Sequence, residues 1–118
     1  MKISKIQELL KAEILCGEDL LDREVESACG SDMMSDVLAY VKDQAVLLTG
    51  LVNPQVIRTA VMMDMVCIVF VRSKTPSEDM IELARTNGMV MMRTTKRMYE
   101  ACGKLYANGL VGNGVKNG

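Results

Sequence analysis

Three continuous apolar segments, each followed by polar residues and then by a helical pattern, constrain the fold of this chain most strongly. They span residues 45–48, 65–71 and 89–92. A strand with one face in water alternates apolar and polar residues, whereas a strand covered on both faces is apolar throughout. The three segments therefore predict strands in the interior of a sheet that carries helices on both faces.

Helix-start signals follow these segments. Asn53 precedes Pro54, which predicts a helix capped by the asparagine with proline in its first turn. Residues 75–78 read Thr-Pro-Ser-Glu and predict a capping box with proline at the first helical position. Gly88, after an asparagine, predicts a left-handed end to that helix. Alternating strands and helices predict an α/β three-layer sandwich with a mainly parallel central sheet.

The first part of the chain is less regular. Apolar spacing predicts a helix over residues 2–11, followed by short strands at 14–16 and near 25–29. Ser31 or Asp32 is expected to cap the next helix. At 118 residues the chain fits one domain, which we place at 1–110, with 111–118 as a flexible tail rich in glycine and asparagine.

Charge and hydropathy exclude several classes of function. The formal net charge is −1, so no overall field favours nucleic acid or an anionic membrane. The longest apolar run, at 65–71, is too short to cross a bilayer, and the first residues do not resemble a secretion signal. We therefore predict a cytoplasmic protein that binds neither nucleic acid nor a membrane.

The sequence carries little that points to catalysis. It has no histidine, the commonest general base and metal ligand, and it matches no common hydrolase, zinc-protease or phosphate-loop motif. Its four cysteines are scattered without metal-binding spacing, which predicts buried free thiols. We predict no metal, no cofactor and no enzymatic activity in the isolated chain, unless a partner chain supplies the missing groups.

The polar residues that follow the predicted strands form the candidate site. In an open parallel sheet the carboxyl ends of the strands share one edge with the helix starts, and ligands bind there. Lys96 and Arg97 belong to this edge, and helix starts favour anions. The hypothesis is a nucleotide or other anion site formed by Thr49, Gly50, Asn53, Arg72, Ser73, Lys74, Thr75, Arg93, Thr94 and Thr95.

Two other interpretations remain open. Serine, threonine and asparagine occur at helix caps whatever the function, and a cation after a strand is often simply solvated. The chain is also rich in methionine, with eleven residues, and methionine forms adaptable contact surfaces. Met33, Met62 and Tyr106 lie off or at the margin of the apolar helical stripes, so they are candidates for a protein-interaction surface.

An ordered set of short segments resembles the DRTGG domain family over residues 2–110. It comprises residues 12–17 (AEILCG), 31–39 (SDMMSDVLA), 48–50 (LTG) with 53–55 (NPQ), 68–72 (IVFVR), 92–95 (MRTT) and 98–101 (MYEA). The chain has Asn-Pro-Gln at 53–55 where the family has Gly-Asp-Arg, and Phe-Val-Arg at 70–72 where the family has Thr-Gly-Gly.

Family members occur as a domain similar to the N-terminal domain of HPr kinase/phosphorylase, within phosphotransacetylases and between CBS domains of regulated pyrophosphatases. Others are small separate proteins, some encoded beside iron-only hydrogenases. The resemblance implies a regulatory module, often dimeric, without catalytic residues of its own. We therefore predict a homodimeric, non-catalytic module that senses a nucleotide or phosphorylated metabolite. The alternative is a dimerisation or interaction module associated with a metabolic or redox enzyme.

Overall fold

Helices and strands alternate along the chain. The computed structural model describes residues 1–40 and 44–112. In order the elements are α1 (Ile3–Leu10), β1 (Glu13–Cys16), the short 3-10 helix η1 (Glu18–Leu20), β2 (Ser27–Gly30), α2 (Met34–Tyr40), β3 (Ala45–Thr49), α3 (Pro54–Met62), β4 (Cys67–Phe70), α4 (Glu78–Thr86), β5 (Val90–Arg93) and α5 (Met98–Ala107).

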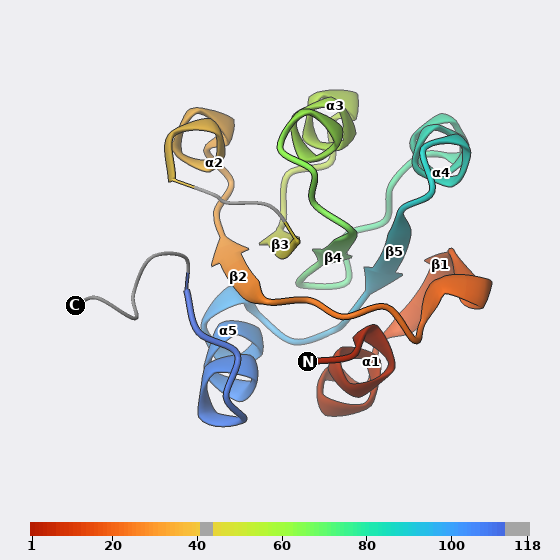
Figure 1. Cartoon of the computed structure of the whole chain (residues 1–118). Helices are drawn as coiled ribbons and strands as arrows, with labels where there is room; N and C mark the ends of the chain where they lie inside the picture. Colours follow the sequence, from red (N-terminus) through yellow and green to blue (C-terminus); the bar gives the residue numbers. More distant parts are fainter. Residues whose placement is uncertain (41–43, 113–118) are drawn as a thin grey trace.

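The strands form one sheet in the order β1-β5-β4-β3-β2 (Figure 1). From β2 to β5 each strand lies parallel to the one before it, joined by a helix. β1 pairs antiparallel with β5, Ile14 opposite Met92, and closes the other edge of the sheet. The predicted α/β fold with a mainly parallel sheet is confirmed.

Side chains of the central strands alternate between two cores. Helices α2, α3 and α4 cover one face of the sheet, and α1 and α5 cover the other (Figure 1). On β4, Ile68 and Phe70 pack with the first group, whereas Cys67 and Val69 pack with the second. All four are fully buried. The uninterrupted apolar segments are therefore covered on both faces, as predicted.

The two predicted helix starts have different outcomes. Asn53 caps α3 as predicted, because its side-chain oxygen accepts the Gln55 N–H at 2.8 Å. The capping box at 75–78 is wrong. α4 begins at Glu78, and Ser77 is its cap, with its Oγ accepting the Met80 N–H at 3.2 Å. Thr75 lies outside the helix, and its hydroxyl oxygen accepts a hydrogen bond from the Arg93 guanidinium at 2.6 Å.

Strand boundaries also shift slightly, and the described residues that follow α5 contact the sheet. The strand predicted near 25–29 begins at Ser27, because the Val25 N–H donates to the Met1 carbonyl at 2.7 Å instead of pairing with β3. Leu110 is buried, and the Ala28 N–H donates to the Val111 carbonyl at 3.1 Å. The flexible tail predicted at 111–118 lies outside the described residues from 113 onward, so the domain boundary stays a prediction.

Candidate functional site

The polar residues predicted to meet do share one edge of the sheet. β2, β3, β4 and β5 are parallel, so their carboxyl ends lie together. Thr49 ends β3, Arg72 closely follows β4, and Arg93 ends β5. β1 is antiparallel and therefore brings its first residue, Glu13, to the same edge opposite Arg93. We call this the carboxyl edge.

A hollow of about 430 Å³ lies on the carboxyl edge, open to solvent. It is lined by Arg72, Ser73, Thr95 and Arg97. The first three belong to the predicted set, and Arg97 lies just beyond it. Two guanidinium groups beside hydroxyl groups are suited to an oxyanion, because charge-assisted hydrogen bonds to phosphate or carboxylate are short and strong.

The wall of this hollow is a turn in an unusual backbone conformation. Arg72 and Ser73 are both left-handed, each with φ of 58°. A non-glycine residue in this region costs about 1–2 kcal/mol. Two hydrogen bonds hold the turn against the β5–α5 connection. The Arg72 N–H donates to the Lys96 carbonyl at 2.8 Å, and the Ser73 N–H donates to the Thr94 carbonyl at 2.9 Å.

Arg93 does not line the hollow. Its guanidinium donates to the Glu13 carboxylate and, at 2.6 Å, to the Thr75 hydroxyl. Arg93 therefore links β1, β5 and the segment that leads into α4, and its charge is already paired. Thr75 is engaged in the same contact. We interpret both residues as supports of the edge rather than as contacts to a ligand.

Three further predicted residues lie outside the hollow. Thr94 is buried, and its hydroxyl donates to the Leu10 carbonyl at the end of α1, 2.8 Å away. The Asn53 side-chain oxygen accepts the hydrogen bond that caps α3. Lys74 is exposed and forms no ion pair within the described part of the chain. The structure thus divides most of the predicted set into hollow-lining and supporting residues, and Lys74 belongs to neither group.

Thr49 and Gly50 contact an acidic residue that the sequence-based set did not include. Asp32 Oδ1 accepts the Thr49 hydroxyl at 2.9 Å and the Gly50 N–H at 2.7 Å. Asp32 Oδ2 lies 4.0 Å from the Arg72 guanidinium. Asp32 does not cap α2, which sequence analysis had offered as one possibility. Its position directly after a parallel strand was a signal that could have placed it at this edge.

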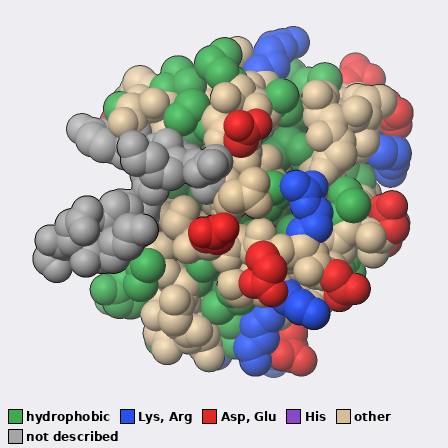
Figure 2. Space-filling model, in the orientation of Figure 1, with side chains coloured by type: hydrophobic (Ala, Val, Ile, Leu, Met, Phe, Trp, Pro, Cys, Tyr) green, Lys and Arg blue, Asp and Glu red, His purple; other side chains and the backbone are tan. Residues whose placement is uncertain are grey.

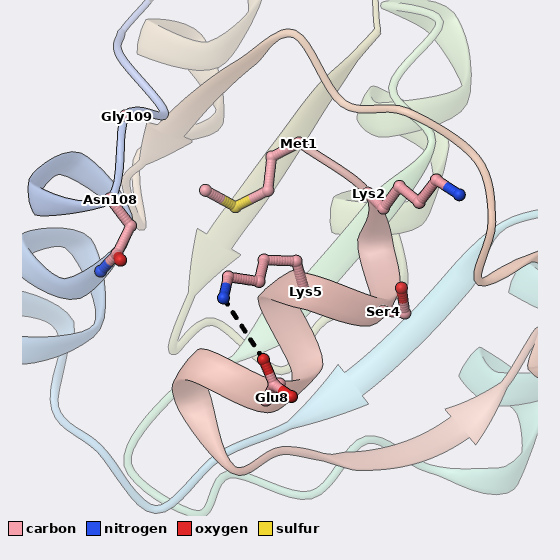
Figure 3. A pocket seen from close by; sticks show the side chains of 7 residues that line it. All are labelled: Met1, Lys2, Ser4, Lys5, Glu8, Asn108 and Gly109. Atoms are coloured by element: carbon pink, nitrogen blue, oxygen red, sulfur yellow. Dashed lines mark hydrogen bonds and ion pairs between the residues drawn. The ribbon is translucent and has the colours of Figure 1, made fainter.

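Other hollows lie away from the carboxyl edge, including one of about 200 Å³ beside Asp64 and Gly88. One of about 510 Å³ separates the start of α1 from the end of α5, and there Lys5 contacts Glu8 while Lys2 extends away from both (Figure 3). A second of about 300 Å³ lies between α3 and α4 and is lined by Ile57, Arg58, Val61, Met62, Leu83 and Asn87. The hollow beside α1 also holds two lysines and a serine, Lys2, Lys5 and Ser4, but Lys5 is paired with Glu8 at 3.4 Å, whereas the hollow between α3 and α4 is mainly apolar.

The three candidate interaction residues are exposed but dispersed. Met33, Met62 and Tyr106 are each more than half exposed. Met33 lies at the start of α2 and Met62 at the far end of α3, whereas Tyr106 belongs to α5 on the opposite face of the sheet. On the face seen in Figure 2, acidic, basic and hydrophobic side chains are mixed, and no one kind covers it. These residues do not form one patch.

The cysteines are free thiols held in their protonated form. Burial raises the pKa of each thiol, most strongly for Cys67, which is fully buried. The other three are Cys16, Cys29 and Cys102. Across residues 1–40 and 44–112 there is no group of three or more metal-ligating side chains. No helix in these ranges is long and apolar enough to cross a membrane.

The fold and the edge together define an open parallel α/β domain whose polar groups gather where such sheets bind ligands. The chain belongs to the DRTGG domain family, whose model matches residues 5–107. The resemblance seen in the sequence is thereby confirmed. No curated protein sequence matches the chain significantly.

A solved structure shares this fold. It contains the CBS and DRTGG domains of the regulatory region of Clostridium perfringens pyrophosphatase, complexed with the activator diadenosine tetraphosphate. The two superpose with a TM-score of 0.73 at 18% sequence identity. The match covers 88% of this chain but only 45% of that one, so this chain spans less than half of its length. At this identity the likeness establishes the fold.

Proposed function

We propose that this chain is a non-catalytic regulatory module that senses an anionic ligand at the carboxyl edge of its sheet. The ligand would be a nucleotide or another phosphorylated metabolite. The observation that carries the proposal is the hollow lined by Arg72, Ser73, Thr95 and Arg97. Its volume of about 430 Å³ falls within the range of small-molecule sites, roughly 300–1,000 Å³.

The electrostatics of the hollow support an anionic ligand. Arg97 immediately precedes α5, and its side chain does not cap that helix. The positive end of the helix therefore adds to the charge of two arginines. Backbone donors contribute less than the sequence suggested, because the N–H groups of Arg72 and Ser73 are bonded within the chain. Recognition at this site depends mainly on side chains.

The non-catalytic part of the proposal rests on the available chemical groups. The chain has no histidine, and burial raises the pKa of all four thiols, which disfavours the reactive thiolate near neutral pH. The family match and the regulatory region of the pyrophosphatase neighbour agree with a sensing role. A cytoplasmic location and a homodimer complete the proposal.

Calorimetric titration with AMP, ADP, ATP and diadenosine tetraphosphate tests the ligand. We expect one of them to bind, and we expect Arg72→Ala and Arg97→Ala each to weaken binding about tenfold or more, as a lost charge-assisted contact does. Arg58→Ala is the matched control, since Arg58 is an exposed arginine on α3 away from the carboxyl edge. Absence of heat with all four nucleotides would refute a nucleotide sensor.

The second candidate function is an interaction module, which the apolar hollow between α3 and α4 favours. Native mass spectrometry of protein purified without added ligand separates the two candidates. A retained small molecule supports the sensor. A stable dimer that carries no ligand, together with silent titrations, supports the interaction module.

A further inference from the structure

Asp32 occupies a set of donors that an external anion would be expected to use. The residue lies between β2 and α2, and its carboxylate reaches to the end of β3. It accepts hydrogen bonds from the Thr49 hydroxyl at 2.9 Å and the Gly50 N–H at 2.7 Å. The Arg72 guanidinium lies 4.0 Å from its other oxygen. A hydroxyl, an amide and a guanidinium thus surround a carboxylate supplied by the chain itself.

The Thr49 and Gly50 donors are held in place before any ligand arrives. Thr49 is fully buried, and its oxygen accepts the Leu51 N–H at 3.1 Å, so its proton points toward Asp32. Glycine at position 50 leaves room for Arg72, because a Cβ there would lie 2.3 Å from the guanidinium and would push the end of that side chain aside. Preformed donors that converge on one oxyanion are typical of an anion subsite.

We propose that Thr49, Gly50 and Arg72 form a second anion subsite, which Asp32 occupies until a ligand displaces it. The inference rests on the proposed function, because Arg72 also lines the neighbouring hollow and so connects the two subsites. One anionic group would bind in the hollow and a second would take the place of the Asp32 carboxylate. The ligand class is therefore a molecule with two adjacent phosphates, such as a nucleoside diphosphate or a longer polyphosphate.

Displacement of Asp32 would alter the start of α2. Asp32 is about half exposed, so its side chain can turn into solvent without crossing the core. The adjacent Met33 is 61% exposed, and its N–H is bonded only to the nearby Ser31 hydroxyl, at 2.9 Å. Asp32 ties this connection to Thr49 and Gly50, and the Ser31 N–H ties it to the Leu48 carbonyl of β3 at 3.0 Å. A ligand that replaces Asp32 would leave the Ser31 bond as the remaining tie to β3, and so would loosen the connection and change the surface around Met33.

Titration with inorganic pyrophosphate and orthophosphate tests the subsite. Asp32→Asn keeps the shape and one acceptor oxygen but removes the charge that competes with the ligand. We expect it to tighten pyrophosphate binding about tenfold and to change orthophosphate binding less than about threefold, since only the larger anion reaches both subsites. Asp64→Asn is the matched control. It removes the same charge at the opposite edge, where a left-handed φ of 55° suits asparagine equally well.

The outcomes separate the two proposals. If Asp32→Asn binds pyrophosphate no more tightly than wild type, the second subsite is overturned. If Arg97→Ala still weakens binding in that case, the proposed sensor remains supported. No binding of either anion by wild type or by Asp32→Asn counts against both. Asp32→Ala, checked for folding by circular dichroism, should behave as Asp32→Asn does. In wild type, pyrophosphate should speed amide hydrogen exchange over residues 31–37, and slower exchange there would contradict displacement.

Discussion

Thr94 offers a direct test of the division between ligand-facing and supporting residues on the carboxyl edge. Its hydroxyl donates to the Leu10 carbonyl at 2.8 Å and accepts the Lys96 N–H at 3.3 Å. Through these contacts it connects the end of β5 to the end of α1 and to the segment that leads into α5. Thr94→Val should therefore destabilise the fold.

The magnitude follows from the groups that lose their partners. Thr94 is 2% exposed, so water cannot readily replace its hydroxyl. A buried carbonyl left without a donor costs about 1–3 kcal/mol. The longer bond from Lys96 contributes less, because its donor is only partly buried. Valine keeps the shape of threonine, so no cavity forms. We expect the free energy of unfolding to fall by about 2 kcal/mol.

Urea unfolding followed by circular dichroism measures this change. With a denaturant slope of roughly 2 kcal/mol/M, the midpoint should fall by about 1 M with the slope unchanged. Thr95→Val is the control: Thr95 is exposed, so the change should stay within about 0.5 kcal/mol. Thr94→Ser, which keeps the hydroxyl, should recover part of the loss. A change below about 0.5 kcal/mol in Thr94→Val would refute the supporting role.

Two further predictions concern stability. Ser77→Ala should lower the free energy of unfolding by about 1 kcal/mol, because α4 loses its cap. An unchanged midpoint of unfolding would show that Ser77 does not cap α4. Burial raises the pKa of Cys67 above its ordinary value of 9.0, so above that pH the unfolded chain loses a proton that the folded chain keeps. The free energy of unfolding should therefore fall as pH rises past about 9. The fall should be steeper in wild type than in Cys67→Ala by about 1.4 kcal/mol per pH unit. Equal slopes of the free energy against pH for the two proteins, measured by urea unfolding, would contradict this.

The parallel direction of four strands follows from local patterns, but the pairing of the edge strand β1 does not. Continuous apolar segments specify strands covered on both faces, and strand–helix alternation specifies a parallel sheet. β1 is different, because it pairs antiparallel with β5 more than seventy residues later in the chain. No local spacing encodes such a contact. The same reason explains why the sequence did not indicate that Glu13 lies beside Arg93.

The sequence predicted which residues lie at the carboxyl edge but not which of their side chains pair with one another. Placement after a parallel strand brought Arg72, Ser73 and Thr95 to one hollow, as parallel topology requires. The same argument counted Arg93 as an available cation, although Glu13 pairs with it. The same argument left Asp32 out of the site, because it treated this residue only as a possible helix cap. Side-chain pairing across a sheet depends on strand order, which the sequence alone does not supply.

The two acid–arginine contacts of the carboxyl edge differ in a way that suits a sensor. Arg93 contacts both Glu13 and Thr75 and is about two-thirds buried, so it fixes the segment before α4. Arg72 and Asp32 are each about half exposed and 4.0 Å apart, and such pairs contribute about 0–1 kcal/mol. In the proposed exchange, an incoming phosphate would replace Asp32 both at this weak Arg72 contact and at the Thr49 and Gly50 donors, while Arg93 holds the segment before α4. A fixed Arg93–Glu13 pair beside an exchangeable Arg72–Asp32 pair would let the edge respond to the proposed ligand without unfolding.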